Sequence, residues 1–233
     1  TRDSISVDLQ YKGRPIRLYD TAGLRRQARI VEGLEKMSVA DSLRSLRYAQ
    51  VVILLMDADS PRDKQDLTLA RRGIDEGRGL SLAINKWDIT EDKQETLQAV
   101  RDRVERSMPQ VKGVPIITLS ALHKKGLDTL MQAAIDLFQV WTVRFSTALL
   151  NRWLHERLEN NPPPLAGGRR VKIRYITQAK TRPPTFMLFG NKVDELPDSY
   201  KRYLVNSLRE DFNVWGTPIR LNVRRSTNPF ADK

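Results

Sequence analysis

The sequence predicts an α/β fold with a mostly parallel sheet and helices on both of its faces, followed by a small second α/β unit. Up to about residue 140, short apolar runs alternate with amphipathic stretches, the pattern of strands and crossover helices in a parallel sheet. Beyond that point the expected order changes to helix, strand, strand, helix, strand. The 233 residues, 40% of them apolar, are enough to fill real hydrophobic cores.

The strands of the first unit are predicted from short, largely apolar runs that suit burial on both faces of a sheet. These runs are residues 14–19, 51–56, 80–84 and 114–119. Apolar side chains recur at helical spacing in three further segments, residues 34–46, 97–104 and 127–137. We expect these segments to be helices that cover the sheet.

The second unit is predicted to begin with a helix that ends at a run of prolines. An apolar stripe between residues 149 and 158 has helical spacing, and Pro162–Pro164 cannot continue that helix. After it we expect strands at 171–175, 185–189 and 219–223 and a helix at 200–208. In the strand 171–175, Val171, Ile173 and Tyr175 are expected to form one side. The boundary is placed near residues 142–145, which gives domains of residues 1–143 and 144–233.

Composition excludes several classes of site. The sequence has no Cys and two distant His residues, so we expect neither a disulfide nor a thiolate metal site. Its longest strictly apolar run, residues 51–56, is far shorter than the ~20 residues of a membrane span, so a cytoplasmic protein without such a span is expected. Because the first residue is Thr1 and not Met, we expect a piece of a longer protein.

The positive charge is concentrated in the second unit. The formal net charge is +12, and from Phe145 onward 16 Lys and Arg stand against eight Asp and Glu. An anionic partner is therefore expected, and nucleic acid is the commonest one in the cytoplasm. A solvated basic face that only aids solubility is the alternative.

Polar motifs follow three of the predicted strands, at the edge where an open parallel sheet binds its ligands. They are Asp20-Thr21-Ala22-Gly23, Asn85-Lys86-Trp87-Asp88 and Ser120-Ala121-Leu122. Polar turns that merely end strands are the alternative, which the order and spacing of three such motifs disfavour. Asp57 also follows a strand and is interpreted as structural.

The side chains of these motifs suit a guanine nucleotide. Asp88 can accept two parallel hydrogen bonds from the donor edge of guanine, whereas adenine would leave its carboxylate unpaired. Asn85 can tie its loop to neighbouring loops, the Lys86 stem can lie along the base and ribose, and the N–H near Ala121 can donate to the guanine carbonyl.

The motif after the first strand suits the phosphates. Asp20 is placed to hold magnesium through water, and Gly23 allows a backbone N–H to approach the terminal phosphate. The predicted nucleotide-binding residues are Asp20, Thr21, Ala22, Gly23, Asn85, Lys86, Asp88, Ser120, Ala121 and Leu122.

The three motifs resemble the third, fourth and fifth signature motifs of P-loop GTPases. Thr1-Arg2-Asp3 resembles the end of the first switch in bacterial ribosome-assembly and tRNA-modification GTPases. The second unit looks like the C-terminal domain of the EngA family, also called Der, in Pro162-Pro-Pro, Gly168-Arg-Arg, Leu196-Pro-Asp-Ser-Tyr-Lys-Arg-Tyr-Leu, Gly216-Thr-Pro-Ile-Arg and Asn228-Pro-Phe. This resemblance covers nearly the whole chain.

The resemblance implies a P-loop GTPase-type sheet followed by a KH-like domain, in a protein with two tandem GTPase domains that acts in maturation of the large ribosomal subunit. It implies GTP or GDP and magnesium as ligands, with Asp20 and Thr1 at the metal, and it allows potassium. The implied partners are the large subunit, its rRNA and the N-terminal GTPase domain of the same chain. Nucleotide state would then control docking onto rRNA.

Two departures from the family pattern affect the expected activity. The sequence has no Gly-x-x-x-x-Gly-Lys-Ser/Thr loop to hold the phosphates, so GTPase activity is expected of the full-length protein and not of this chain alone. Leu24 stands where many GTPases have the Gln that positions the attacking water, so no catalytic residue is identified. Residues 24–29 are interpreted as a second switch or a solvated basic loop. A non-enzymatic RNA- or ribosome-binding module with a vestigial nucleotide pocket is the rival hypothesis.

The second unit has no Gly-x-x-Gly loop between helices, which clamps the backbone in RNA-binding KH domains. Strand alternation predicts that four basic residues share the sheet face opposite the helices and contact RNA phosphates without base recognition. They are Lys172, Arg174, Arg220 and Arg224. A face covered by the missing GTPase domain is the alternative.

Overall fold

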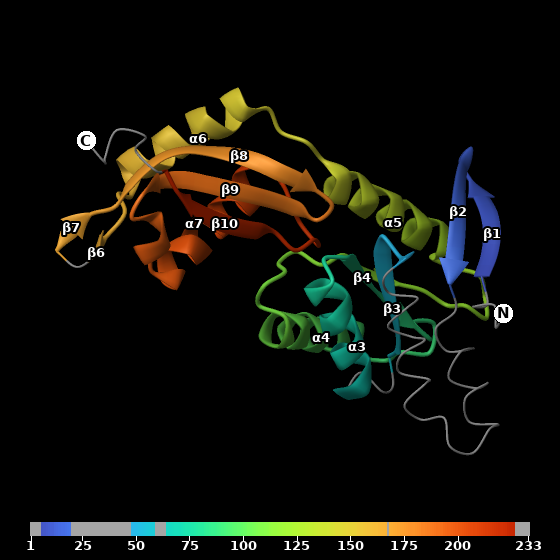
Figure 1. The fold of residues 1–233 in the computed structure, drawn as a ribbon. Helices are drawn as coiled ribbons and strands as arrows, with labels where there is room; N and C mark the ends of the chain where they lie inside the picture. Colours follow the sequence, from blue (N-terminus) through green and yellow to red (C-terminus); the bar gives the residue numbers. More distant parts are fainter. Residues whose placement is uncertain (1–5, 20–47, 59–63, 167, 227–233) are drawn as a thin grey trace, which may run out of the picture.

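The computed structural model describes residues 6–19, 48–58, 64–166 and 168–226, which form two neighbouring α/β units (Figure 1). Each unit has its own hydrophobic cluster of buried side chains. Four of the sequence predictions lie outside these residues: Thr1, the motif at residues 20–23, the loop 24–29 and the helix 34–46. No helix in the described ranges is long and apolar enough to cross a membrane.

The sheet of the first unit is parallel, as predicted. Its strand order is β3 (Val51–Asp57), β4 (Gly79–Asn85) and β5 (Ile116–Thr118). The register pairs Asp57 with Asn85, so the last residues of β3 and β4 lie next to each other. The carboxyl ends of these strands form the edge at which the ligand was expected.

Helices cover both faces of the first sheet. They are α3 (Lys64–Asp75), α4 (Lys93–Ser107) and α5 (Leu127–Thr142). Alternate residues of β4, such as Leu82 and Ile84, pack into a cluster with α3 and α4, whereas Gly79 lies against Leu137 of α5. The first six residues of β4 are all buried, as a strand covered on both faces should be.

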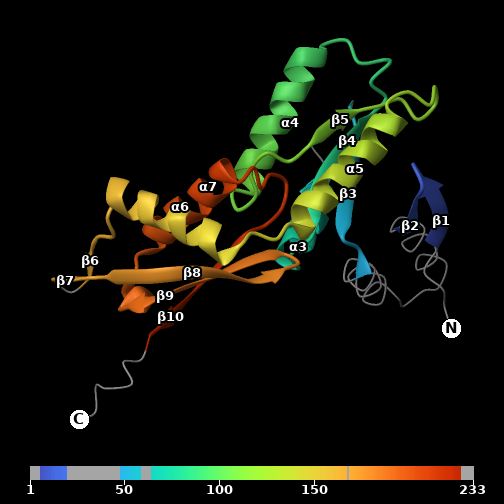
Figure 2. The ribbon, with the colours of Figure 1, turned by 90° about the horizontal axis from the view of Figure 1, so that it is seen from above.

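The prediction of a buried strand at 14–19 is wrong. These residues form β2 (Arg14–Tyr19), which among the described residues pairs antiparallel only with β1 (Ser6–Tyr11). The hairpin stands beside one end of α5, where the Tyr11 hydroxyl donates to the Asp128 carboxylate at 2.6 Å (Figures 1 and 2). Arg14 and Arg17 are exposed, and two charged side chains in six residues are the reason that this segment is not a core strand.

The second unit has the predicted order of helix, two strands, helix and strand. Its main elements are α6 (Thr147–Asn160), β8 (Lys172–Thr181), β9 (Pro184–Asn191), α7 (Asp198–Asp211) and β10 (Arg220–Arg225). The central strand β9 is antiparallel to β8 and parallel to β10. Both helices pack on one side of this sheet (Figure 2). A short hairpin of β6 (Leu165–Ala166) and β7 (Arg169–Arg170) and a 3₁₀ turn at Val193–Glu195 were not anticipated.

The helix before the prolines, α6, ends as expected, and two of its side chains bind the end of α7. The Ser146 hydroxyl caps α6 by accepting from the N–H of Leu149 at 3.2 Å, and α6 stops two residues before Pro162. The Trp153 indole donates to the Asp211 carboxylate at 2.7 Å, and Arg157 pairs with the same carboxylate. This arrangement fixes α6 against the end of α7.

A β-bulge overturns the predicted alternation in β8. Ile173 pairs with Gly190 and Tyr175 pairs with Phe189, which leaves Arg174 as an extra residue without a partner. Ile173 is buried as expected, but Tyr175 is 41% exposed, on the side of the sheet that faces away from the helices. One inserted residue exchanges the two faces of a strand, and this is why Tyr175 was assigned to the wrong one.

The two units contact each other at the amino ends of β4 and β5. The carbonyl of Gly216 accepts from the N–H of Leu80 at 2.9 Å, and the N–H of Gly216 donates to the carbonyl of Lys112 at 2.9 Å. Arg209, only 1% exposed, donates to the carbonyls of Val214, Thr217 and Gln110 at 2.8, 2.8 and 3.1 Å. Burial lowers the pKa of Arg209 to about 10, so this junction holds a charged guanidinium at neutral pH.

Candidate functional site

Asn85 connects three strand ends at the carboxyl edge of the first sheet. Its side-chain carbonyl accepts from the N–H of Ala121 at 2.9 Å, and its amide nitrogen lies 3.5 Å from the carboxylate of Asp57. These contacts join the ends of β3 and β4 to the loop after β5. The loops of this edge therefore form one connected surface.

Lys86 is held in a strained turn by the same carboxylate. Its φ of 62° lies in the left-handed region, and its ammonium is 2.9 Å from Asp57. The next residue, Trp87, donates its N–H to the carbonyl of Leu119 at 3.1 Å. The turn is thus anchored to both neighbouring strands, while about two fifths of the Lys86 side chain (42%) stays exposed.

Asp88 is fixed at the surface by the loop after β5. A hydrogen bond with the Ser120 side chain is the main cause that lowers the pKa of Asp88, and His123 and Lys125 add attraction of opposite charge. The His123 imidazole lies 3.6 Å from the carboxylate. Asp88 is therefore ionised at neutral pH and presents an acceptor to a ligand with paired N–H donors.

The loop from Ser120 to Gly126 has a tightly determined backbone. Ser120 and Lys125 exchange two backbone hydrogen bonds of 3.0 Å each. Gly126 has a φ of 81°, and a Cβ there would lie 2.5 Å from the carbonyl oxygen of Thr118, so only glycine fits. This closed loop presents Leu122 to solvent, 82% exposed.

The structure shows which backbone N–H near Ala121 is available to a ligand. A backbone N–H near Ala121 was expected to face the guanine carbonyl, and the N–H of Ala121 itself donates to Asn85. Among the described residues, the N–H of Leu122 has no such partner, because the hydrogen bonds of this loop use its neighbours instead. Leu122 therefore supplies the available backbone donor.

The structure brings together the six predicted base-site residues that it describes: Asn85, Lys86, Asp88, Ser120, Ala121 and Leu122. The predicted phosphate and magnesium residues, Thr1, Asp20, Thr21, Ala22 and Gly23, lie outside the described ranges. Within those ranges no cluster of three His, Asp or Glu side chains could hold a metal ion. Asp57 was interpreted as structural, yet it contacts both Asn85 and Lys86. Its position at the end of β3 was the sequence feature that could have indicated this contact.

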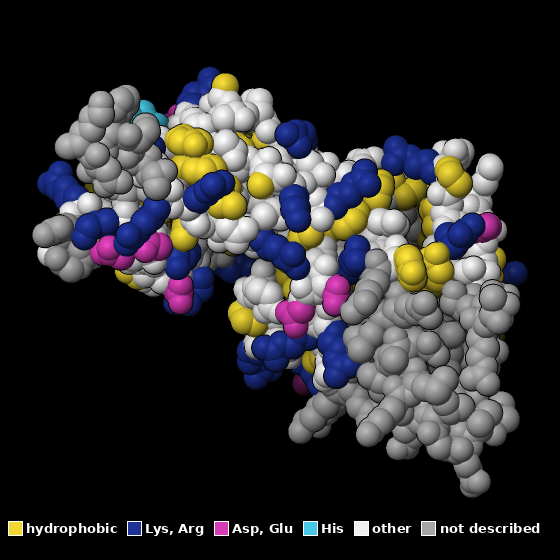
Figure 3. Space-filling view, in the orientation of Figure 1, with side chains coloured by type: hydrophobic (Ala, Val, Ile, Leu, Met, Phe, Trp, Pro, Cys, Tyr) yellow, Lys and Arg dark blue, Asp and Glu magenta, His cyan; other side chains and the backbone are white. Residues whose placement is uncertain are grey.

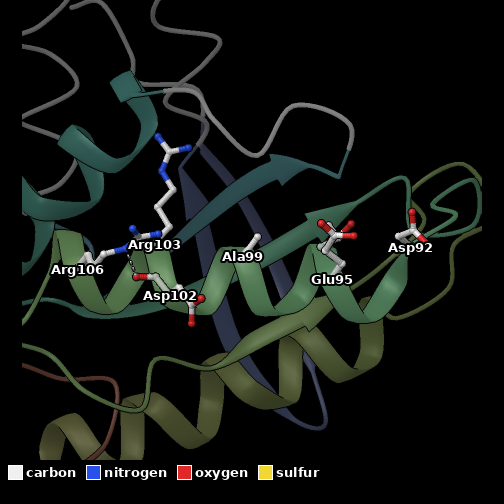
Figure 4. A pocket seen from close by; sticks show the side chains of 7 residues that line it. Asp92, Glu95, Ala99, Asp102, Arg103 and Arg106 are labelled. Carbon is white, nitrogen blue, oxygen red and sulfur yellow. Dashed lines mark hydrogen bonds between the residues drawn. The ribbon is translucent and has the colours of Figure 1, made fainter.

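A hollow of about 610 Å³ runs along α4 and is separate from this constellation (Figure 4). Its lining comes from α4 and the residue before it: Asp92, Glu95, Thr96, Ala99, Asp102, Arg103 and Arg106. None of these residues belongs to the motifs at the carboxyl edge of the sheet. We assign no role to it.

The four predicted RNA contacts are all exposed but differ in their surroundings. Lys172 and Arg224 lie on the open face of the second sheet by their register with Asn191 and Phe189. Arg174 is the bulge residue. The Arg220 guanidinium instead donates to the carbonyl of Asp75 at 2.9 Å, which places it at the junction of the two units.

Comparisons with known proteins agree with this arrangement. Residues 36–140 match the family described as the elongation factor Tu GTP binding domain. Residues 144–224 match the family described as the KH-domain-like, C-terminal domain of EngA bacterial GTPase enzymes.

Curated relatives match over all 233 residues. The chain is 53% identical to GTPase Der of Bradyrhizobium sp. (strain BTAi1) and 50% identical to GTPase Der of Parvibaculum lavamentivorans (strain DS-1). It spans about half the length of these relatives, 51% and 49%. A crystal structure of Era in complex with MgGDPNP and nucleotides 1506–1542 of 16S ribosomal RNA is 15% identical, with a TM-score of 0.44 over 99% of this chain and 82% of that one. Because it matches these curated relatives and the EngA-specific domain, the chain belongs to the EngA, or Der, family of GTPases.

Proposed function

We propose that the carboxyl edge of the first sheet binds the guanine base of GTP and GDP in the full-length protein, which hydrolyses GTP. The observation that supports this most directly is the ionised Asp88 carboxylate, fixed by Ser120 beside the loops that Asn85 joins. A carboxylate in such a position accepts from the N1–H and amino group of guanine and leaves adenine unpaired. The Lys86 stem lies along the base, and the N–H of Leu122 donates to the guanine carbonyl.

The remaining assignments follow from family membership. Asp20 and Thr1 hold magnesium at the phosphates, Thr21 to Gly23 contact the terminal phosphate, and potassium is a further ion of the site. The nucleotide domain is residues 1–143 and the KH-like domain is residues 144–233, a division supported by two separate hydrophobic clusters. This sequence has no Gly-x-x-x-x-Gly-Lys-Ser/Thr loop, so we propose that another part of the full-length protein supplies the phosphate loop.

We further propose a role in maturation of the large ribosomal subunit, in which nucleotide state controls docking of the basic second unit onto rRNA. Support comes from family membership and from the excess of Lys and Arg after residue 145. Lys172, Arg174 and Arg224 are the phosphate contacts; Arg220 is less accessible because it already binds Asp75. Ribosomal partners place the protein in the cytoplasm.

A base-selectivity switch tests the nucleotide assignment. In xanthine the amino group of guanine is replaced by a carbonyl, to which an amide can donate. Asp88→Asn in the full-length protein should therefore weaken guanosine diphosphate at this site by ~100-fold, because one hydrogen bond to a charged acceptor is lost and the other becomes a neutral one. The same variant should gain one binding site for xanthosine diphosphate, measured by calorimetry.

Asp92→Asn is the matched control, because Asp92 is an exposed carboxylate four positions later in the chain. It should leave both nucleotides unaffected. Unchanged selectivity in Asp88→Asn would refute the base site and favour the rival function, a ribosome-binding module whose nucleotide pocket is vestigial.

A further inference from the structure

The open face of the second sheet has a stacked aromatic pair on β8 and β9. Tyr175 of β8 and Phe189 of β9 are register partners, with ring centroids 4.4 Å apart and planes inclined by only 9°. The pair uses one face of the Tyr175 ring, and this side chain is still 41% exposed. An exposed aromatic ring on an uncovered sheet offers its free face for stacking with another planar group.

Basic side chains border this pair. Arg224 is the register partner of Phe189 on β10, and Arg174 precedes Tyr175 in the bulge. Within the described ranges neither residue, nor Lys172, pairs with a carboxylate. Figure 3 looks onto this face and shows hydrophobic side chains among Lys and Arg over β8 and β9.

The neighbouring Arg225 differs from the cations of the open face. Arg225 points to the other side and forms ion pairs with Asp194 and Glu195. The cations around Tyr175, in contrast, remain available for an anionic partner.

We infer that this face binds single-stranded RNA, with an unpaired base stacked on Tyr175 and its phosphates held by Arg174, Arg224 and Lys172. The inference rests on the proposed function, since it specifies which RNA the basic unit takes. Stacking platforms flanked by cations are how proteins hold single strands, because each base has an apolar face and each linkage a negative charge. An RNA duplex keeps its bases stacked inside and presents phosphates, 2′-hydroxyls and base edges, so its paired bases do not stack on the ring.

The inference adds base stacking to the expectation that this face contacts phosphates without base recognition, because stacking on a ring does not read sequence. That expectation assumed strict alternation, which would have turned Tyr175 into the core. The bulge at Arg174 places an aromatic ring among the cations instead.

The test compares two RNAs on the 233-residue chain: a fluorescein-labelled oligouridine and a blunt-ended RNA duplex of equal length, titrated by fluorescence anisotropy. Tyr175→Ala should weaken oligouridine binding by roughly 5- to 150-fold, the effect of one base–aromatic stack, and leave duplex binding within about two-fold. Tyr175→Phe keeps the ring and should bind like the wild type. Phe138→Ala, which removes an exposed ring on α5, is the matched control and should change neither.

A salt series separates the phosphate contacts from the stack. Arg224→Gln should reduce the slope of log affinity against log salt by ~0.7 for the single strand, whereas Tyr175→Ala should leave the slope unchanged. The exposed Arg202 of α7 supplies the control for charge, as Arg202→Gln. Circular dichroism of each variant confirms folding.

Three outcomes would overturn the inference. Equal binding of oligouridine by Tyr175→Ala and wild type would show that the ring is not used. In the second outcome the wild type binds duplex and single strand with equal affinity, and Tyr175→Ala changes neither affinity. That result would be compatible with rRNA docking and would refute only the stacking site. In the third outcome the wild type binds neither RNA but forms a complex with an added N-terminal GTPase domain, and this complex depends on Tyr175. That result would refute both rRNA docking and the stacking site, and would make the face an interdomain contact.

Discussion

Asp57 orients two side chains of the proposed base site from the end of β3. Its carboxylate is 2.9 Å from the Lys86 ammonium and 3.5 Å from the Asn85 amide. The nucleotide would therefore meet a Lys86 stem whose far end is already tethered. Such a residue acts by positioning, because it reaches the ligand only through its neighbours.

Asp57→Asn removes the negative charge and keeps the shape. Both partners of the ion pair are about 40% exposed, at 42% and 40%, so the pair contributes roughly 1 kcal/mol or less. We expect up to about a five-fold loss of guanosine diphosphate affinity in the full-length protein, with the preference for guanine over xanthine unchanged. Asp8→Asn, which breaks the exposed ion pair of Asp8 with Arg17 on the hairpin, is the control and should have no effect on the nucleotide. A changed base preference in Asp57→Asn would contradict a positioning role.

The residues that sequence predicted at this edge are those whose position follows from topology alone. Asn85 and Ser120 come directly after apolar runs, and parallel strands place such residues at one edge. The partner of the Ala121 N–H was not predictable, because a backbone N–H can donate to any acceptor that the folded loop places near it. Asp57 was visible at a strand end, but its contacts depend on the register between β3 and β4.

At the scale of single elements, a bulge and a glycine have the largest consequences. Sequence alternation located β8 but could not show the bulge, since no residue type at Arg174 demands one. The strand at 14–19 was located correctly, but its burial was not, because its two arginines were visible and the apolar residues between them were given too much weight. In both cases the pairing partner decides which face is buried.

Gly216 allows the two units to approach closely. Its φ is 68°, and a Cβ at this position would lie 2.9 Å from both Leu137 and Pro115. The same residue exchanges backbone hydrogen bonds with Leu80 and Lys112. A side chain here would have to displace α5 or the loop before β5.

Gly216→Ala should therefore destabilise the junction beyond the backbone strain of its positive φ. Gly168 is a matched control, because its φ is 73° and no atom lies within 4 Å of the position that a methyl group would take there. Alanine in the left-handed region costs about 1–2 kcal/mol at either site. Overpacking adds roughly 1–3 kcal/mol at Gly216 only. Urea unfolding followed by tryptophan fluorescence measures the difference, and equal destabilisation of the two variants would argue against a tight junction.

On the scale of the whole molecule, β4 connects the proposed nucleotide site to the second unit. Asn85 at its carboxyl end joins the base-site loops, and Leu80 near its amino end binds Gly216 of the second unit. The buried Arg209 of α7 reaches the carbonyl of Gln110 in the first unit. One strand thus runs from the proposed base site to the junction with the second unit, which is the connection that the proposed control of docking would use.

Ribosome docking under an altered nucleotide tests this account most directly. If Asp88 holds the base, full-length Asp88→Asn should bind xanthosine triphosphate at this site, and the wild type should not. The measurement is sedimentation with large ribosomal subunits. We expect the fraction of the variant bound to the subunits to differ several-fold between xanthosine triphosphate and xanthosine diphosphate. The bound fraction of the wild type should be the same with both nucleotides. Identical sedimentation of the variant with the two xanthine nucleotides, although it binds both, would contradict the claim that the nucleotide at this site controls docking.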